Sequence, residues 1–299
     1  MRKILKLTLV FLVLIPFLFA AGQKGKGKIE LPGKVKKAFK KALKKGEFKN
    51  PYKIQIIDQY NFKGLPGSVF VVLLFKGEIP QPKKGQNNYL YAKVIRSDGG
   101  YINVVKVIKG QAKEFYSFVL LLPAGEYRFL MGVGDKKGKK FSMIMTKLKV
   151  ESPETPGEIT HTRPMFIKDY VRGSREEVLR EVIPDAFYSG MIKVFPYLKP
   201  SFTADQQPIV FMFLYGVGKD ETGMARGTVK FTILKDGKEF VKFKETGLKG
   251  RGGIGIIDQP IIFKKEDKPL PAGKYELEIK IKDEILKKEI NVKLPFEII

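Results

Sequence analysis

The chain has 299 residues, of which 43% are hydrophobic and 12% aromatic; this composition is typical of a folded protein with room for two domains. It contains no cysteine, which excludes disulfides, thiolate metal ligands and cysteine nucleophiles. The net charge of +25 attracts polyanions such as nucleic acid, anionic lipid and acidic polysaccharide. Abundant lysine without cysteine or tryptophan is also a composition found in proteins from hot environments.

Residues 1–22 have the pattern of a secretory signal peptide. Arg2, Lys3 and Lys6 precede an apolar run from Leu7 to Phe19, and small residues follow at 20–22. The run is shorter than the roughly 20 apolar residues that a membrane-spanning helix needs, so cleavage is expected rather than retention as an anchor. The sequence therefore predicts an exported protein, periplasmic or extracellular, without a transmembrane span in the mature chain. Nucleic acid is not an expected partner there.

Residues 23–50 form a basic segment with eleven lysines and two glutamates. Within it, apolar residues such as Val35, Phe39 and Leu43 recur at helical spacing after Pro32, which predicts a short amphipathic helix. Its lysines are the candidate residues for binding an anionic surface: Lys36, Lys37, Lys40, Lys41, Lys44 and Lys45. One interpretation is a helix lying on an anionic membrane. The other, favoured because the apolar stripe is small, is a helix docked on the next domain with its lysines in solvent.

Residues 51–150 and 188–299 contain strand-like segments in the same order. In both halves a segment of mixed polarity precedes an unbroken apolar run, and an Asp-Gly pair then interrupts a longer alternating segment. These segments are Lys53–Tyr60, Val69–Phe75 and Tyr89–Ile108 in the first half, and Met191–Tyr197, Ile209–Tyr215 and Thr228–Phe243 in the second. Asp98-Gly99 and Asp236-Gly237 each predict a hairpin with a type I′ turn, which requires positive φ at both central residues.

A hexapeptide then occurs twice, as LPAGEY at 122–127 and LPAGKY at 270–275. Each copy leads into an alternating strand, and a closing strand follows at 144–150 or 290–294. Four such features in the same order indicate an internal duplication. The charge at the fifth position reverses between Glu126 and Lys274, which is typical of a solvent-facing turn and not of a catalytic motif.

The pattern Leu-x-x-Gly-x-Tyr at Leu122 and Leu270 resembles immunoglobulin-like and fibronectin-type-III-like β-sandwiches. The resemblance implies that the hydroxyls of Tyr127 and Tyr275 bond back to nearby backbone. The predicted fold is all-β, with two tandem immunoglobulin-like β-sandwich domains at 51–150 and 188–299 and a short basic N-terminal helix. The chain departs from antibody-type domains in lacking their cysteines and tryptophan, and the resemblance carries no functional residues.

The segment 151–187 between the halves is predicted to be a linker with a short helix. It begins with ESPETPGE, a composition typical of linkers. Ser174 and Glu177 have the spacing of a helix-capping box, and Pro184 is expected to end the helix.

The glycine-rich sequence GRGGIG at 250–255 matches the dinucleotide-binding pattern, but a strand-like run and not a helix follows it. We interpret it as a flexible loop or bulge. In this stretch the second half is about ten residues longer than the first half, so Gly247–Asp258 is the candidate interaction loop. The residues assigned to that loop are Lys249, Gly250, Arg251, Gly252 and Gly253.

No catalytic, cofactor-binding or metal-binding residues are assigned, and no cofactor is expected. His161, the one histidine, lies in the linker without a ligand pattern, and Asp220 with Glu221 fits a hydrated loop tip. A sugar platform would have to use Tyr89, Tyr91 or Tyr101, of which the first two are expected in a core.

The sequence therefore predicts an exported, non-enzymatic structural or protein-interaction module of the cell envelope. Its expected partners are an envelope protein or an anionic surface. The alternatives are an envelope hydrolase that uses carboxylates on loops, and a binder of anionic polysaccharide or lipid.

Overall fold

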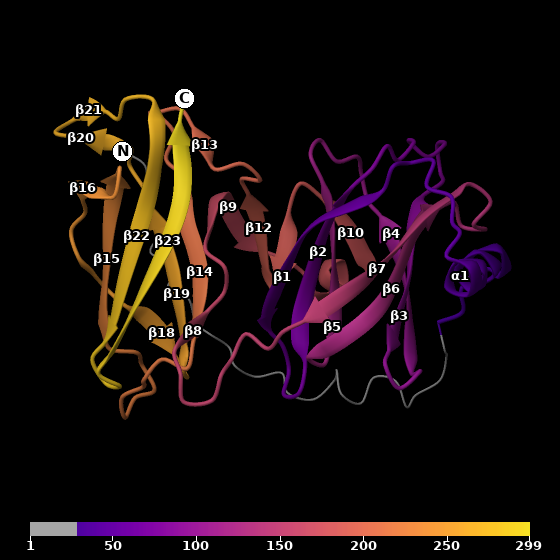
Figure 1. The fold of residues 1–299 in the computed structure, drawn as a ribbon, viewed down its shortest axis with the longest axis horizontal. Helices are drawn as coiled ribbons and strands as arrows, with labels where there is room; N and C mark the ends of the chain where they lie inside the picture. The colour runs from indigo at the N-terminus through magenta and orange to yellow at the C-terminus, as the bar shows by residue number, and fades with distance from the viewer. Residues whose placement is uncertain (1–28) are drawn as a thin grey trace.

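The structure is a computed structural model and describes residues 29–299. The predicted signal peptide, 1–22, and the start of the basic segment lie outside the described residues. Strands dominate, so the all-β prediction is confirmed at the level of fold class. Two β-units lie side by side along the long axis of the molecule, and helix α1 (Gly33–Lys45) lies against the far end of the first unit (Figure 1).

The first unit is built on one eight-stranded sheet that folds over a hydrophobic core. Its strand order is β1-β2-β5-β10-β4-β3-β6-β7. The strands are β1 (Gln55–Lys63), β2 (Val69–Lys76), β3 (Asn88–Arg96), β4 (Tyr101–Ile108), β5 (Tyr116–Leu122), β6 (Gly125–Gly134), β7 (Phe141–Val150) and β10 (Glu181–Pro184). The layer β1-β2-β5 faces the layer β4-β3-β6-β7 across a core that includes Leu73, Phe118 and Phe129. The two edges approach each other, since Gln59 Nε2 donates to the backbone oxygen of Lys149 at 2.7 Å.

The second unit consists of two larger facing sheets and a short two-stranded ribbon. The seven-stranded sheet contains β11 (Phe187–Ser189), β12 (Ile192–Pro196), β9 (Met165–Arg172), β14 (Ile209–Tyr215), β19 (Ile254–Pro260), β18 (Lys249–Arg251) and β8 (Thr160–His161). The six-stranded sheet contains β13 (Ser201–Phe202), β23 (Lys288–Ile298), β22 (Gly273–Asp283), β15 (Gly227–Lys235), β16 (Lys238–Lys242) and β17 (Thr246–Gly247). The ribbon pairs β20 (Lys264–Lys265) with β21 (Lys268–Pro269). The core between the sheets includes Met212, Phe231 and Leu277.

The two hexapeptides form the same corner twice. The hydroxyl of Tyr127 donates to the backbone oxygen of Pro123 at 2.7 Å, and the hydroxyl of Tyr275 donates to that of Pro271 at 2.7 Å. The glycines have φ of 150° and 149°, a conformation that L-residues rarely adopt. The predicted bond from each tyrosine hydroxyl back to the turn is confirmed.

Both Asp-Gly hairpins form, but with different turns. Asp236 and Gly237 have φ of 51° and 74° between β15 and β16, as a type I′ turn requires. In the hairpin between β3 and β4 of the first unit, Gly99 has a positive φ of 85° but Asp98 does not, and four residues separate the two strands. The type I′ prediction is therefore wrong for this hairpin. Asp98 stabilises the longer turn instead, because its Oδ1 accepts from the backbone N–H of Gly100 at 2.9 Å.

The segment 151–187 contains the predicted helix, α2 (Arg175–Arg180), with the predicted capping box between Ser174 and Glu177. The helix ends at Arg180 and not at Pro184, because residues 181–184 form β10. This strand pairs in parallel with β4 and antiparallel with β5, and so joins the two layers of the first unit. Strand β9 belongs to the second unit, where it and β8 pair with β14. The segment therefore contributes strands to both units and is not simply a linker.

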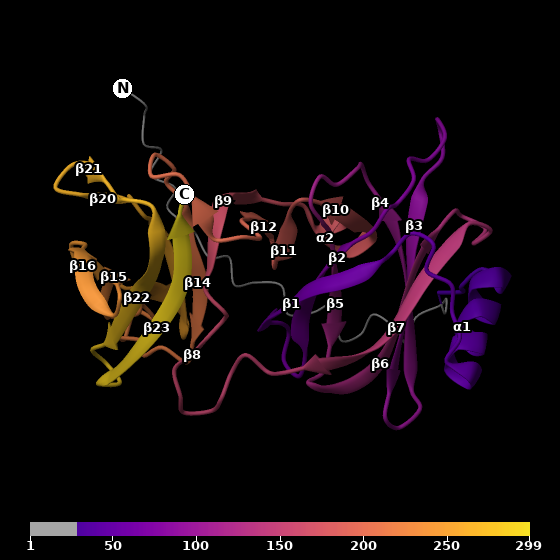
Figure 2. The ribbon, with the colours of Figure 1, turned by 45° about the horizontal axis from the view of Figure 1, so that its top comes forward.

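The first strand predicted for the second half, Met191–Tyr197, corresponds to β12 but has a different position. It pairs with β9 and β11, whereas β8 and β9 occupy the place beside β14. Strands β9 and β12 lie on the side of the second unit that faces the first unit in both views (Figure 1, Figure 2), and Figure 2 shows β11 there as well. The strands of the two units therefore correspond from β2 and β14 onward, and the strands that precede these two do not occupy equivalent positions.

A third hydrophobic core joins the units. It contains side chains from the outer face of the layer β1-β2-β5, from the outer face of β14, and from strands β9, β11 and β12. Its large side chains are Tyr60, Phe62, Leu74, Phe115, Phe187, Tyr188, Phe211, Phe213 and Tyr215. Because β2 and β14 are buried on both faces, each is an unbroken apolar run and does not alternate.

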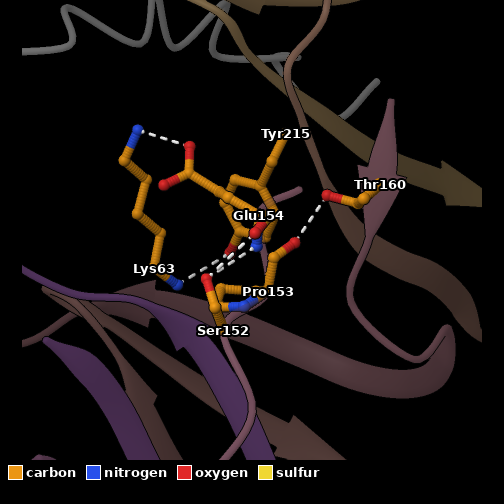
Figure 3. A network of polar contacts seen from close by, with 6 residues as sticks. All are labelled: Lys63, Ser152, Pro153, Glu154, Thr160 and Tyr215. Atoms are coloured by element: carbon orange, nitrogen blue, oxygen red, sulfur yellow. Dashed lines mark hydrogen bonds and ion pairs between the residues drawn. The ribbon is translucent and has the colours of Figure 1, made fainter. Parts of the chain in front are cut away.

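A polar network closes one edge of this third core (Figure 3). The backbone N–H of Lys63 donates to the hydroxyl of Tyr215 at 3.2 Å, and Lys63 Nζ pairs with Glu154 at 2.7 Å. The hydroxyl of Thr160 donates to the backbone oxygen of Pro153 at 2.5 Å. Hydrogen bonds and an ion pair thus join strand β1, residues 153–160 and strand β14 at a single place.

Lys106 is a buried lysine in the first unit, and its burial leads us to expect that stability depends on pH. Its side chain on β4 is 4% exposed, and its Nζ donates to the backbone oxygen of Val178 in α2 at 3.1 Å. Burial lowers the pKa of Lys106 to about 8 from its usual 10.5. Between these values the unfolded chain binds more protons than the folded chain, so stability rises with pH in this window.

We expect the free energy of unfolding to rise by about 2 kcal/mol between about pH 7 and pH 9.5, and Lys106→Met to abolish most of this rise. Denaturant unfolding at both pH values measures it. The range stops below pH 10 because burial raises the pKa of Tyr60 to about 12, and that contribution to stability is lost as pH rises from 10 to 12. Equal pH dependence in the wild type and the variant would contradict this account of Lys106.

Candidate anion-binding site

Helix α1 is docked on the first unit through its apolar face. Val35, Phe39 and Ala42 are buried, and Gly46 ends the helix in the left-handed conformation with φ of 71°. The helix packs on the outer face of the layer β4-β3-β6-β7, where Leu130 and Tyr91 are among its contacts. Of the two interpretations from the sequence, the docked helix is confirmed. The apolar residues of α1 pack against the sheet in this contact.

The strand alternation explains both the docking and the charge beside it. Successive residues of a strand point to opposite faces, so Tyr91, Lys93 and Ile95 of β3 share the outer face. Tyr91 and Ile95 lie in the cluster under α1. Lys93 carries a charge onto the same face, and Arg128 of β6 does so one strand away, next to Leu130 in alternation. The helix therefore borders a cationic part of the sheet.

The six predicted lysines are all exposed, but they do not form one site. Residues four apart on a helix share a ridge, so Lys36, Lys40 and Lys44 form one ridge and Lys37, Lys41 and Lys45 form another. The first ridge lines a groove between α1 and the sheet, which we call the α1–β3 groove. Of the second ridge, Lys41 lines a different groove on the other side of the helix, and Lys37 and Lys45 line neither.

The α1–β3 groove has a volume of about 500 Å³, and no carboxylate lines it. Its lining residues are Leu31, Lys36, Phe39, Lys40, Leu43, Lys44, Lys93, Tyr101, Asn103 and Arg128. Five cationic side chains from α1, β3 and β6 thus surround one hollow. Tyr101 is 52% exposed, and the Nζ of Lys93 lies 3.9 Å from the centroid of its ring.

One acidic residue adjoins these cations. Glu30 pairs with Lys36 at 3.4 Å, but both side chains are at least half exposed, so the pair contributes little and leaves the lysine accessible to a competing anion. The groove on the other side of α1 is lined by fewer cations, and Glu47 lines it as well and pairs with Lys41 at 2.8 Å. The α1–β3 groove is therefore the stronger anion site of the two.

Sequence reasoning missed Lys93 and Arg128, and it considered Tyr101 only as a possible sugar platform, apart from the lysines of α1. The available signal was a charge at alternating positions of β3 and β6 that are otherwise apolar on that face. Nothing in the local pattern shows that α1 would lie beside these positions, since the helix is some 50 residues away from β3 along the chain. Tyr91 lies in the core under α1, as predicted, and Tyr89 packs against it.

The glycine-rich segment is a hairpin and not the predicted flexible loop. Lys249, Gly250 and Arg251 form β18, and Gly252 and Gly253 form its tight turn with φ of 63° and 84°. The hairpin is also tied to a neighbouring loop, because the backbone N–H of Gly252 donates to the backbone oxygen of Gly223 at 2.8 Å. A strand follows the glycines, so the context of a dinucleotide site is lacking, as predicted.

The residues considered for catalysis are dispersed. No group of three or more His, Cys, Asp or Glu side chains that could hold a metal ion occurs within residues 29–299. The His161 side chain is exposed. Asp220 accepts hydrogen bonds from Thr222 and Arg226, which hold the pKa of its carboxyl well below the usual range. It stabilises a turn and is a poor base. Within the same residues no helix has the length and apolarity to cross a membrane.

Comparison with known proteins assigns no family. No family model matches the chain, and no curated protein matches it. Among solved structures, a β-glycosidase from Bacteroides vulgatus aligns over 82% of this chain with 10% identity and a TM-score of 0.24. The chain spans 24% of that protein's length. A TM-score this low supports no argument about fold or activity.

Proposed function

We propose that the protein is an exported, non-enzymatic interaction module of the cell envelope, made of two tandem immunoglobulin-like β-sandwiches and held on an anionic surface by α1. In each unit a layer around β2 or β14 faces the four-stranded layer β4-β3-β6-β7 or β16-β15-β22-β23. That arrangement, with a tyrosine corner before β6 and β22, resembles fibronectin-type-III-like domains.

The observation that carries the proposal is the docking of α1. Because its apolar face is buried, all seven of its lysines are presented to solvent in a fixed geometry, and Lys93 and Arg128 extend the positive surface. Lysines near an anionic surface each contribute about 1 kcal/mol to attachment. The second unit lies at the opposite end of the long axis (Figure 1), so its strand edges and loops project away from that surface.

A hydrolase would need two carboxyl groups about 5 to 10 Å apart in a cleft. Glu47 is the one carboxylate that lines either groove beside α1. These grooves therefore offer no acid–base pair, and no observation favours the hydrolase.

The test compares two variants of equal net charge. In the first, the six lysines of α1 are replaced by glutamine: Lys36, Lys37, Lys40, Lys41, Lys44 and Lys45. In the second, six exposed lysines of the second unit are replaced: Lys238, Lys244, Lys264, Lys268, Lys274 and Lys282. We expect the first variant to lose about tenfold or more in affinity for vesicles with anionic lipid and for a soluble acidic polysaccharide, and the second to lose much less.

Binding to neutral vesicles and to an uncharged polysaccharide measures the background. Equal losses in the two variants would show that net charge alone causes attachment, and would contradict the assignment to α1.

A further inference from the structure

We propose that the α1–β3 groove binds a linear acidic polysaccharide, one chain of which lies along α1. The inference rests on the proposed attachment through α1 and names the anion that the groove fits. The ligand class follows from three observations: the apolar face of α1 is used, the cations surround a hollow, and an exposed aromatic ring lines it.

The burial of α1 argues against a lipid bilayer as the ligand. An interfacial helix binds a membrane by inserting an apolar face into the region of the headgroups. Here Val35, Phe39 and Ala42 contact the sheet and are unavailable. Only the lysine ridges are left for a bilayer, and a flat surface would contact all ridges alike.

The cations of the groove, in contrast, approach a ligand from two sides. Lys36, Lys40 and Lys44 come from the helix, and Lys93 and Arg128 come from the sheet. Lys93 is half-buried, so it lies lower than the helix ridge. A narrow polymer chain can enter the hollow and meet both walls, whereas a planar surface is held off by the ridge.

The spacing of the helix wall is regular. Residues four apart on an α-helix are separated by about 6 Å along its axis, so the three lysines form a row about 12 Å long. Successive rings of an extended acidic polysaccharide carry carboxylates at a similar repeat. A row of equally spaced cations can neutralise such a chain at several positions, whereas a single small anion uses only one or two of them.

Tyr101 selects a sugar among the linear polyanions. All other tyrosines of the chain are buried or half-buried, so the exposed ring of Tyr101 is unusual, and it lies in the wall of the cationic groove. An aromatic ring packs against the apolar C–H face of a pyranose, a contact that polyphosphate cannot make. The ammonium of Lys93 lies over this ring, and a sugar that displaces it from the ring face can keep it paired through the sugar's own carboxylate.

The full-length protein tests the proposal by titration with size-defined oligouronates. The matched variants are Lys36→Gln/Lys40→Gln/Lys44→Gln in the groove and Lys37→Gln/Lys41→Gln/Lys45→Gln on the neighbouring ridge, which remove equal charge from the same helix. We expect the groove variant to lose about tenfold or more in affinity and the ridge variant about threefold or less. Affinity should rise with oligomer length until the row of three lysines is filled.

The role of the ring is tested separately. Tyr101→Ala should weaken oligouronate binding about tenfold and leave binding of inorganic polyphosphate unchanged, while Tyr101→Phe should keep the affinity for oligouronate. Circular dichroism checks that each variant retains its fold.

Two outcomes would overturn the inference while leaving the proposed attachment intact: equal losses in the two triple variants, or stronger binding to anionic vesicles than to any oligouronate. If neither ligand is bound more weakly when all six lysines of α1 are replaced, the proposed function itself fails. The two failures are therefore distinguishable.

Discussion

Replacing Phe187 with alanine is expected to lower the free energy of unfolding by about 3 to 5 kcal/mol. Phe187 is fully buried in the core between the two units, where its ring stacks on Tyr60 at 5.3 Å and on Phe62 at 6.0 Å between centroids. Its removal leaves a cavity between β1 and β11, strands that belong to different units. Denaturant unfolding followed by circular dichroism measures the loss.

The same experiment reports on the coupling of the units. Because the shared core links them, we expect the wild type to unfold in one transition and the variant to show a smaller dependence on denaturant concentration, as the units begin to unfold separately. Phe48→Ala is the control: this side chain is 42% exposed and should cost about 1 kcal/mol at most. A loss for Phe187→Ala no greater than that of the control would show that the third core contributes little.

Replacing Phe39 with alanine is expected to release α1 from the sheet. Phe39 is 2% exposed, and its ring lies 5.8 Å from that of Phe141 between centroids. Its loss should cost about 3 kcal/mol. An isolated helix shorter than about 12 to 15 residues is marginal in water, and like charges four apart, as in α1, destabilise it further. The undocked segment should therefore unfold, with a loss of helical signal in circular dichroism.

Phe39→Ala distinguishes binding that needs the docked position of α1 from binding that needs only the net charge of the protein. It keeps every lysine, so if attachment depends only on net charge, the affinity for an acidic polysaccharide will not change. If the α1–β3 groove binds the polymer, we expect a loss about as large as that of the triple groove variant. Phe48→Ala, an exposed position that follows α1 and does not line the α1–β3 groove, should keep both the helical signal and the affinity and serves as the control.

Local features of the sequence were predictable because each depends on neighbours along the chain. The Asp236-Gly237 turn, the capping box at Ser174 and the apolar face of α1 follow from turn chemistry and helical periodicity, whereas the tyrosine corners were implied by the resemblance to immunoglobulin-like sandwiches. The first Asp-Gly turn differs because four residues instead of two separate its strands, and Asp98 accepts a hydrogen bond from the backbone N–H of Gly100.

What the sequence determined by itself was therefore the β class, the repeated order of strands, the corners and the face by which α1 docks. Tertiary structure alone decided that β10 inserts between β4 and β5, that β9 and β11 build a third core between the units, and that Lys93, Arg128 and Tyr101 lie beside the lysines of α1. Periodicity shows which residues of an element share a face, but the partner of that face is set by contacts between residues far apart in the chain.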